Sequence, residues 1–256
     1  MTEHNEQNEE KPVAANYSVR KLMLQSLELF SSNDIAKETL KLAVMTLIGM
    51  LILFGIFYFG FFAQSKNFME KFGWLMIDLI VALVVVSSSA WHWKNFQGMS
   101  CSSGMMVGMV QGMLTAFLIG IIFGVSNGMF VGSVIGIVLG MALGTWVGKS
   151  CGIMGVLEAE MAAFMAGPMG AMVSIMMVND YYQVFIPFTI VLSTVFLGNT
   201  ALSRSIEMNT PECCIVKRTA RQDFLLFLGL NFIAFLILAG IMLYGPKSAL
   251  FSITLN

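Results

Sequence analysis

Residues 104–152 read GMMVGMVQGMLTAFLIGIIFGVSNGMFVGSVIGIVLGMALGTWVGKSCG and decide the fold of this chain. Glycine stands at every fourth position, with Ala116 filling one step, in the row Gly104, Gly108, Gly112, Gly120, Gly124, Gly128, Gly132, Gly136, Gly140, Gly144, Gly148 and Gly152. In lipid, where the solvent is as apolar as the side chains, helices associate through small residues that let two backbones approach. This row, a glycine zipper of repeated GxxxG steps, therefore predicts membrane helices built for close contact.

The zipper is too long for one membrane crossing. Forty-nine residues at ~1.5 Å each far exceed a hydrocarbon core of ~30 Å. Ser126-Asn127-Gly128 is the turn-forming cluster inside the run, so we expect a hairpin of two spans over 104–125 and 129–148. The four-residue period drifts slowly around each helix, which favours a right-handed crossing.

Composition places the whole chain in the membrane class. Of its 256 residues 57% are hydrophobic and 11% are charged, and the net charge of −1 argues against nucleic-acid binding. Residues 1–16 are polar and acidic, which predicts a disordered tail rather than a cleaved signal peptide. Residues 17–38 repeat apolar side chains at helical spacing. They predict a short amphipathic helix, either at the membrane surface or packed on another subunit.

The remaining chain predicts an all-α, polytopic membrane helix bundle over residues 39–248, with a short tail at 249–256. About seven transmembrane helices fit the apolar runs, with the glycine hairpin as the third and fourth. The fifth contains Pro168, which should kink it. The other five spans are expected at 41–63, 72–93, 151–178, 182–202 and 223–244.

Basic residues orient these spans. With the N-terminus inside, all but three of the lysines and arginines fall in cytoplasmic segments, as the positive-inside rule requires. The exceptions are Lys66, Lys71 and Lys247. A six-span alternative would put the basic loop after 182–202 on the wrong side, so the prediction is N-in and C-out.

The fifth span carries a row of thioethers. At 100° per residue, six methionines lie within about 60° of Glu158 on a helix; they are Met154, Met161, Met165, Met169, Met172 and Met176. The adjoining face holds the small residues Ala159, Ala163, Ala166 and Gly170, which would admit another helix. Met105, Met109 and Met113 form a shorter row on the third span. Uncharged thioethers suit Cu(I) or Ag(I), so such a row, on a surface shared between close helices, could pass an ion along. Alternatively, the methionines fill space opposite a glycine groove.

Polar residues inside spans are candidates for function because their burial in lipid is costly. Glu158 shares the methionine side, whereas Glu160 points some 200° away, so the two cannot chelate one ion. Asp78, Asn231 and Gln111 are further intramembrane polar residues. The alternative for the acids is a protonated carboxyl that hydrogen-bonds to backbone or amide groups.

Four cysteines fall on the predicted cytoplasmic side: Cys101, Cys151, Cys213 and Cys214. Because the hairpin returns the chain to its starting side, Cys101 and Cys151 could be neighbours in space. Thiols kept reduced in the cytosol bind soft metals. They could also be purely structural, since the chain has no CxxC spacing.

A resemblance adds to this interpretation. The run SCGIMGVLEAEMAAFMAGPMGAMVSIMM (150–177), joined to the zipper before it, resembles uncharacterised bacterial Gly/Met-rich polytopic membrane proteins. Some of these accompany cupredoxin-type copper proteins, and the likeness covers about residues 99–180. It implies a multi-pass protein of the bacterial inner (cytoplasmic) membrane. It also implies copper handling, with copper as the cofactor, carried by Glu158 and Met154, Met161, Met165, Met169 and Met172. The Met-x3-Met and Gly-x3-Gly elements also look like those of Ctr-type copper transporters, but here both share the third span, so that family is not assigned.

Three functions follow as expectations, and none is enzymatic, because the sequence has no phosphate-binding loop, no haem or zinc spacing and no catalytic triad motif. The first is binding or transport of a soft metal ion, most readily Cu(I), along the methionine-lined helices. The second is an accessory subunit that packs through glycine zippers in a larger membrane complex, or with further copies of itself. The third is a cation or proton channel that uses Asp78 and Glu158.

Overall fold

The chain is described by a computed structural model in which every element with assigned bounds is an α-helix. The residues it describes are 41, 44–52, 55, 73–94, 101–149, 152–177, 182–207 and 220–245. The predicted tail at 1–16, the amphipathic helix at 17–38, the C-terminal tail at 249–256 and parts of the first span lie outside these residues.

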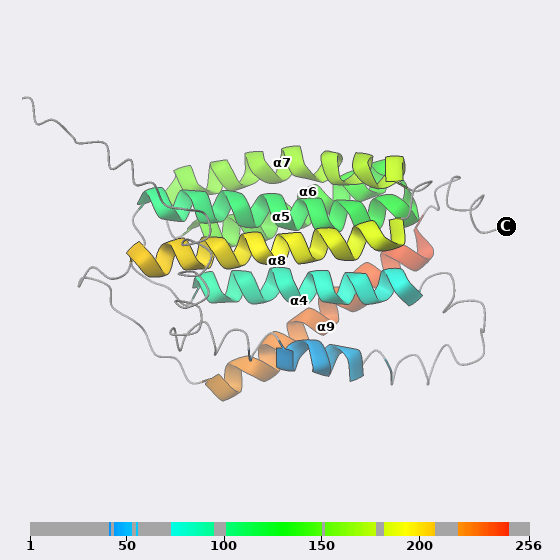
Figure 1. Ribbon diagram of the computed structural model, residues 1–256, viewed down its shortest axis with the longest axis horizontal. Helices are drawn as coiled ribbons and strands as arrows, with labels where there is room; N and C mark the ends of the chain where they lie inside the picture. Colours follow the sequence, from blue (N-terminus) through cyan, green and yellow to red (C-terminus); the bar gives the residue numbers. More distant parts are fainter. Residues whose placement is uncertain are drawn as a thin grey trace, which may run out of the picture.

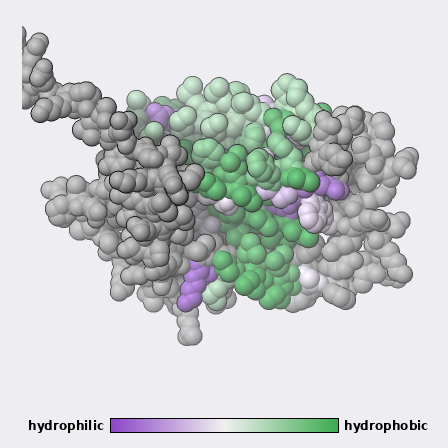
Figure 2. Space-filling model, in the orientation of Figure 1, coloured by the Kyte–Doolittle hydropathy of each residue, from purple (hydrophilic) through white to green (hydrophobic). Residues whose placement is uncertain are grey.

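Six long helices follow one another in the described part of the chain (Figure 1). They are α4 (Trp74–Lys94), α5 (Cys101–Asn127), α6 (Met129–Gly148), α7 (Gly152–Met177), α8 (Tyr182–Glu207) and α9 (Ala220–Tyr244). A shorter helical stretch covers residues 44–52. Five of the six are long and apolar enough to cross a membrane; α8 is apolar over the shorter stretch Gln183–Gly198. Figure 2 shows a mainly hydrophobic surface over the described middle of the bundle, with hydrophilic residues toward its ends.

The predicted break in the zipper is confirmed. Helix α5 ends at Asn127, Gly128 separates the helices with φ 92° and ψ 171°, and α6 begins at Met129. Side chains with a Cβ are almost excluded from that backbone region, so glycine allows a one-residue turn here. Asn127 connects the turn to α9. Its Nδ2 donates a hydrogen bond to the Ile241 carbonyl oxygen at 3.3 Å, and its Oδ1 accepts a hydrogen bond from the Ser126 hydroxyl.

Helices α5, α6 and α7 form the tightest part of the bundle. A methyl group added at Gly132 would lie 2.6 Å from the Gly124 nitrogen, and one added at Gly120 would lie 2.7 Å from the Gly167 carbonyl oxygen. Real Cβ atoms essentially never come within 3.0 Å of such atoms. The three backbones are therefore closer than any side chain would allow, which is the contact that small residues permit between membrane helices.

These contacts are arranged in layers that each take one small residue from each helix. Gly144, for example, faces the Gly112 Cα and the Ala159 Cβ, while Gly140 faces the Cβ atoms of Ala116 and Ala163. From one end to the other the layers are Gly108, Gly148 and Gly155; Gly112, Gly144 and Ala159; Ala116, Gly140 and Ala163; Gly120, Gly136 and Gly167; Gly124, Gly132 and Ala171. We call this the small-residue core.

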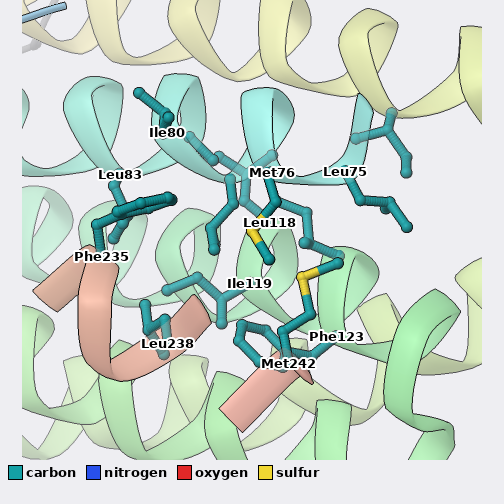
Figure 3. Close-up of a cluster of buried hydrophobic side chains, with 14 of the residues drawn as sticks. Leu75, Met76, Ile80, Leu83, Leu118, Ile119, Phe123, Phe235, Leu238 and Met242 are labelled. Atoms are coloured by element: carbon teal, nitrogen blue, oxygen red, sulfur yellow. The ribbon is translucent and has the colours of Figure 1, made fainter. Parts of the chain in front are cut away.

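A conventional apolar core joins α5 to α4 and α9 on its other side. Figure 3 shows α4, α5 and α9 meeting through large side chains, among them Met76, Leu118 and Met242. Gln111 adds a polar tie, because its Nε2 donates to the Val86 carbonyl oxygen at 2.9 Å and its Oε1 accepts from Ser89 at 2.7 Å. Helix α5 is thus the centre of the bundle, packed by backbone contact on one side and by side chains on the other.

Candidate functional site

The methionines of α7 form one continuous surface on the outside of the small-residue core. Because Gly155, Ala159, Ala163, Gly167 and Ala171 turn toward α5 and α6, the opposite side of the helix turns away from them. Beside the exposed Ile153, Leu157 and Phe164, the outward side of α7 carries Met154, Glu158, Met161, Met165, Met169, Met172 and Met176. We call these seven residues the methionine face.

The expectation that this row lines a surface shared between close helices of one chain is wrong. Its six methionine side chains are between 47% and 68% exposed. The physical reason is steric: helices approach most closely where side chains are smallest, so the row of glycine and alanine takes the interior. The thioethers are left to face whatever surrounds the chain.

Glu158 is the unusual member of the methionine face. It is exposed, it lies six residues into a helix long enough to cross a membrane, and its neighbours on that surface are apolar. At ~1.5 Å per residue it lies about 9 Å from the start of α7. Glu160 is half-buried on another side of the helix, as predicted, so the two acids do not form one site.

The outward surfaces of α8 and α9 differ from the methionine face. Exposed side chains on α8 include Val184, Phe188, Val191 and Phe196, and those on α9 include Leu230 and Ile233. Within these two helices no methionine is among the exposed large hydrophobic residues. Surfaces made of branched and aromatic side chains are suited to contact with lipid chains.

The shorter methionine row on α5 is also at the surface. Met109 and Met113 are exposed, together with Met106, whereas Met105 is half-buried. Both rows therefore lie on the outside of the same three-helix unit.

Three of the predicted intramembrane polar residues are buried: Asp78 in α4, Gln111 in α5 and Asn231 in α9. Asp78 is only 6% exposed, and its Oδ2 accepts no hydrogen bond from the described residues. Asn231 is buried and its Nδ2 donates to the Phe227 carbonyl oxygen of its own helix. Figure 1 places α4 and α7 on opposite sides of α5, so Asp78 and Glu158 do not share a surface.

The cysteines contribute little to the described structure. Cys101 is the first residue of α5, and Cys151, Cys213 and Cys214 lie outside the described residues. Their proximity stays a prediction. Among the described residues, no three His, Cys, Asp or Glu side chains are placed to hold a metal ion together. The soft-ligand candidates among the described residues are therefore the methionine face and the shorter methionine row on α5.

One part of the small-residue core could have been found in the sequence. A second four-residue period lies in α7, starting three residues after Gly152: Gly155, Ala159, Ala163, Gly167 and Ala171, with alanine at three of the five positions. Counting glycine and alanine as one class would have revealed this second row of small residues. It would also have assigned the methionines to the outside.

Comparison with protein-family models gave no match to this chain. Neither the curated proteins nor the solved structures gave a significant match.

Proposed function

We propose that this chain is a non-catalytic subunit of a membrane assembly and that it docks onto other membrane spans through the methionine face of α7. The observation that carries the proposal is an exposed carboxylic acid, Glu158, among six exposed methionines on a span-length helix whose opposite side is already filled. Glu158 lies about 9 Å into α7. An acidic side chain that faces lipid costs ~2.5 kcal/mol or more at the bilayer centre and less toward the interface, so such residues usually face protein or water.

Methionine supports the same interpretation. Its unbranched side chain adapts to irregular partners, and it is used heavily at protein surfaces that bind other helices. A surface made only to meet lipid has no need for this residue, as α8 and α9 illustrate with valine, leucine, isoleucine and phenylalanine. The methionine face therefore resembles an interface more than a lipid-facing surface.

The membrane orientation belongs to this proposal. Seven spans, with the N-terminus in the cytoplasm and the C-terminus outside, agree with the distribution of lysine and arginine in the sequence. The bacterial inner membrane is the proposed location. In this orientation α7 starts at the cytoplasmic side and Glu158 lies in its cytoplasmic half.

Photo-crosslinking in intact membranes tests the docking surface. A benzophenone amino acid in place of Met165, which is 65% exposed, should give an adduct with another polypeptide. The same probe in place of Val191 on α8, which is 61% exposed, should give none because lipid surrounds it. Gel electrophoresis after irradiation reads out both variants. Equal adduct yields at the two positions, or an absence of protein adducts at Met165, would count against the proposal.

Cu(I) binding is the second candidate, and the aligned thioethers favour it. Thioethers are soft, uncharged ligands that select Cu(I), and Glu158 adds one hard oxygen donor on the same face. Because the row is exposed, ligands from another chain can add to its own thioethers, so this function is compatible with the interface proposed above.

Metal content is expected to fall when the sulfur atoms are removed. In protein purified after exposure to Cu(I), the double variant Met161→Leu/Met165→Leu should carry less copper per chain than the unchanged protein. Leucine nearly preserves volume and apolarity, so packing should change little. Met129→Leu, on an exposed residue of α6, is the matched control and should leave copper content unchanged. Equal copper in all three proteins would exclude the row as a binding site.

A further inference from the structure

We infer that the occupant of the methionine face is a second copy of this chain, in a parallel dimer whose two-fold axis runs along the membrane normal beside α7. The inference rests on the proposed function and names its partner. Its starting observation is that Glu158 lies on a surface that otherwise offers only thioethers and apolar groups.

Glu158 needs a hydrogen-bonding partner at its own depth. Copies of one chain insert in the same orientation, so a two-fold axis along the membrane normal brings each residue to the level of its counterpart. Two carboxyl groups at one depth can share a proton or form paired hydrogen bonds. A different protein would have to supply a polar group of its own at that level.

The rest of the methionine face is also compatible with itself. Six flexible thioethers recur from Met154 to Met176 along almost the whole length of α7, about 33 Å at ~1.5 Å per residue. The side chains of two such rows can pack between one another without a fixed complementary shape, because methionine is unbranched and has several rotatable bonds. By contrast, Phe130 and Val138 of α6 and Phe188 and Val191 of α8 are exposed on surfaces with no acid to pair.

The small-residue core makes such a dimer geometrically simple. Because α5 and α6 are bound to the opposite side of α7, they leave the methionine face open along its length. Among the described helices, none needs to move for a second copy to approach.

Single-cysteine crosslinking tests the inference directly. In full-length protein with Cys101, Cys151, Cys213 and Cys214 changed to serine, Met161→Cys, Met165→Cys and Met172→Cys should each form a disulfide with the same residue of a second copy. The product runs at twice the mass of the chain in non-reducing gels of oxidised membranes. Val191→Cys on α8, at a residue that is 61% exposed, should stay monomeric and controls for random collisions.

The role of Glu158 is tested by a second substitution in the Met165→Cys protein, with the amount of crosslinked dimer as the measurement. Glu158→Gln keeps a side chain that can pair across the axis and should retain the crosslinked band. Glu158→Leu removes the hydrogen bond and should lose most of it. Undiminished crosslinking in Glu158→Leu would overturn the carboxyl pairing. Detergent size-exclusion profiles identify variants that fail to fold, and co-purification of two differently tagged copies provides a measurement without substitutions.

The mass of the product separates this inference from the proposed function. A band at twice the chain mass supports both. An adduct of any other mass at Met165, from the benzophenone variant, overturns the dimer and leaves docking in place. Failure of both crosslinkers to capture protein at the methionine face overturns the dimer and the proposed function together.

Discussion

Gly132→Ala is expected to lower the free energy of unfolding by about 3 kcal/mol, at the upper end of the range for overpacked cores. The added methyl group would lie 2.6 Å from the Gly124 nitrogen and 2.9 Å from both the Gly124 Cα and the Gly120 carbonyl oxygen. All of these are backbone atoms, so no side-chain rotation can relieve the clash. The hairpin would have to separate, and contacts in neighbouring layers of the small-residue core would weaken with it.

Unfolding of the purified protein by SDS in mixed micelles measures this effect as a shift of the midpoint. Gly229→Ala in α9 is the matched control, because a methyl group there would meet no atom within 4 Å. Alanine is the better helix former by up to ~1 kcal/mol, so the control should be neutral or slightly stabilising. If both variants unfold at the same SDS fraction, the layered contacts do not hold the bundle together.

Gly128→Ala is expected to cost about 2 kcal/mol, for a different reason. Gly128 has φ 92° and ψ 171°, a combination that strains any residue with a Cβ by ~1–3 kcal/mol. Because this residue alone connects α5 to α6, the strain cannot be spread over a longer loop. The hairpin should therefore lose stability although no interhelical contact is removed.

The same SDS titration tests this prediction, with Gly240→Ala as the control. Gly240 lies within α9, and an added methyl group would meet nothing within 4 Å. A Gly128→Asn variant should lose a similar amount, since ψ 171° lies outside the left-handed helical region in which asparagine is tolerated. Wild-type stability in Gly128→Ala would mean that the turn relaxes to another backbone conformation at no cost.

The hairpin could be predicted from the sequence because its signals are local. A four-residue period of glycine, a span length and a Ser-Asn-Gly cluster together located α5, α6 and the break between them. The grouping of methionines on one side of α7 followed from helical geometry in the same way. These features depend only on residues near one another in the chain.

The direction in which the methionine face points could not be predicted from residues near one another in the chain. It depends on which face of α7 contacts α5. The face of small residues permits close approach of the backbones, whereas the methionine face would pack through its side chains. Local spacing does not decide it until Gly167 and Ala171 are recognised as members of a row of small residues along α7 that starts at Gly155. Likewise, the hydrogen bond from Gln111 to the Val86 carbonyl oxygen joins two helices, and no local sequence pattern predicts it.

The layered backbone contacts also constrain how this protein can change shape. Because α5, α6 and α7 meet at five successive levels through glycine and alanine, with their backbones in close contact, these helices cannot slide or rotate past one another without steric conflict. They form a rigid body. Any hinge in the described part of the chain must therefore lie where larger, rotatable side chains join α4, α8 and α9 to it.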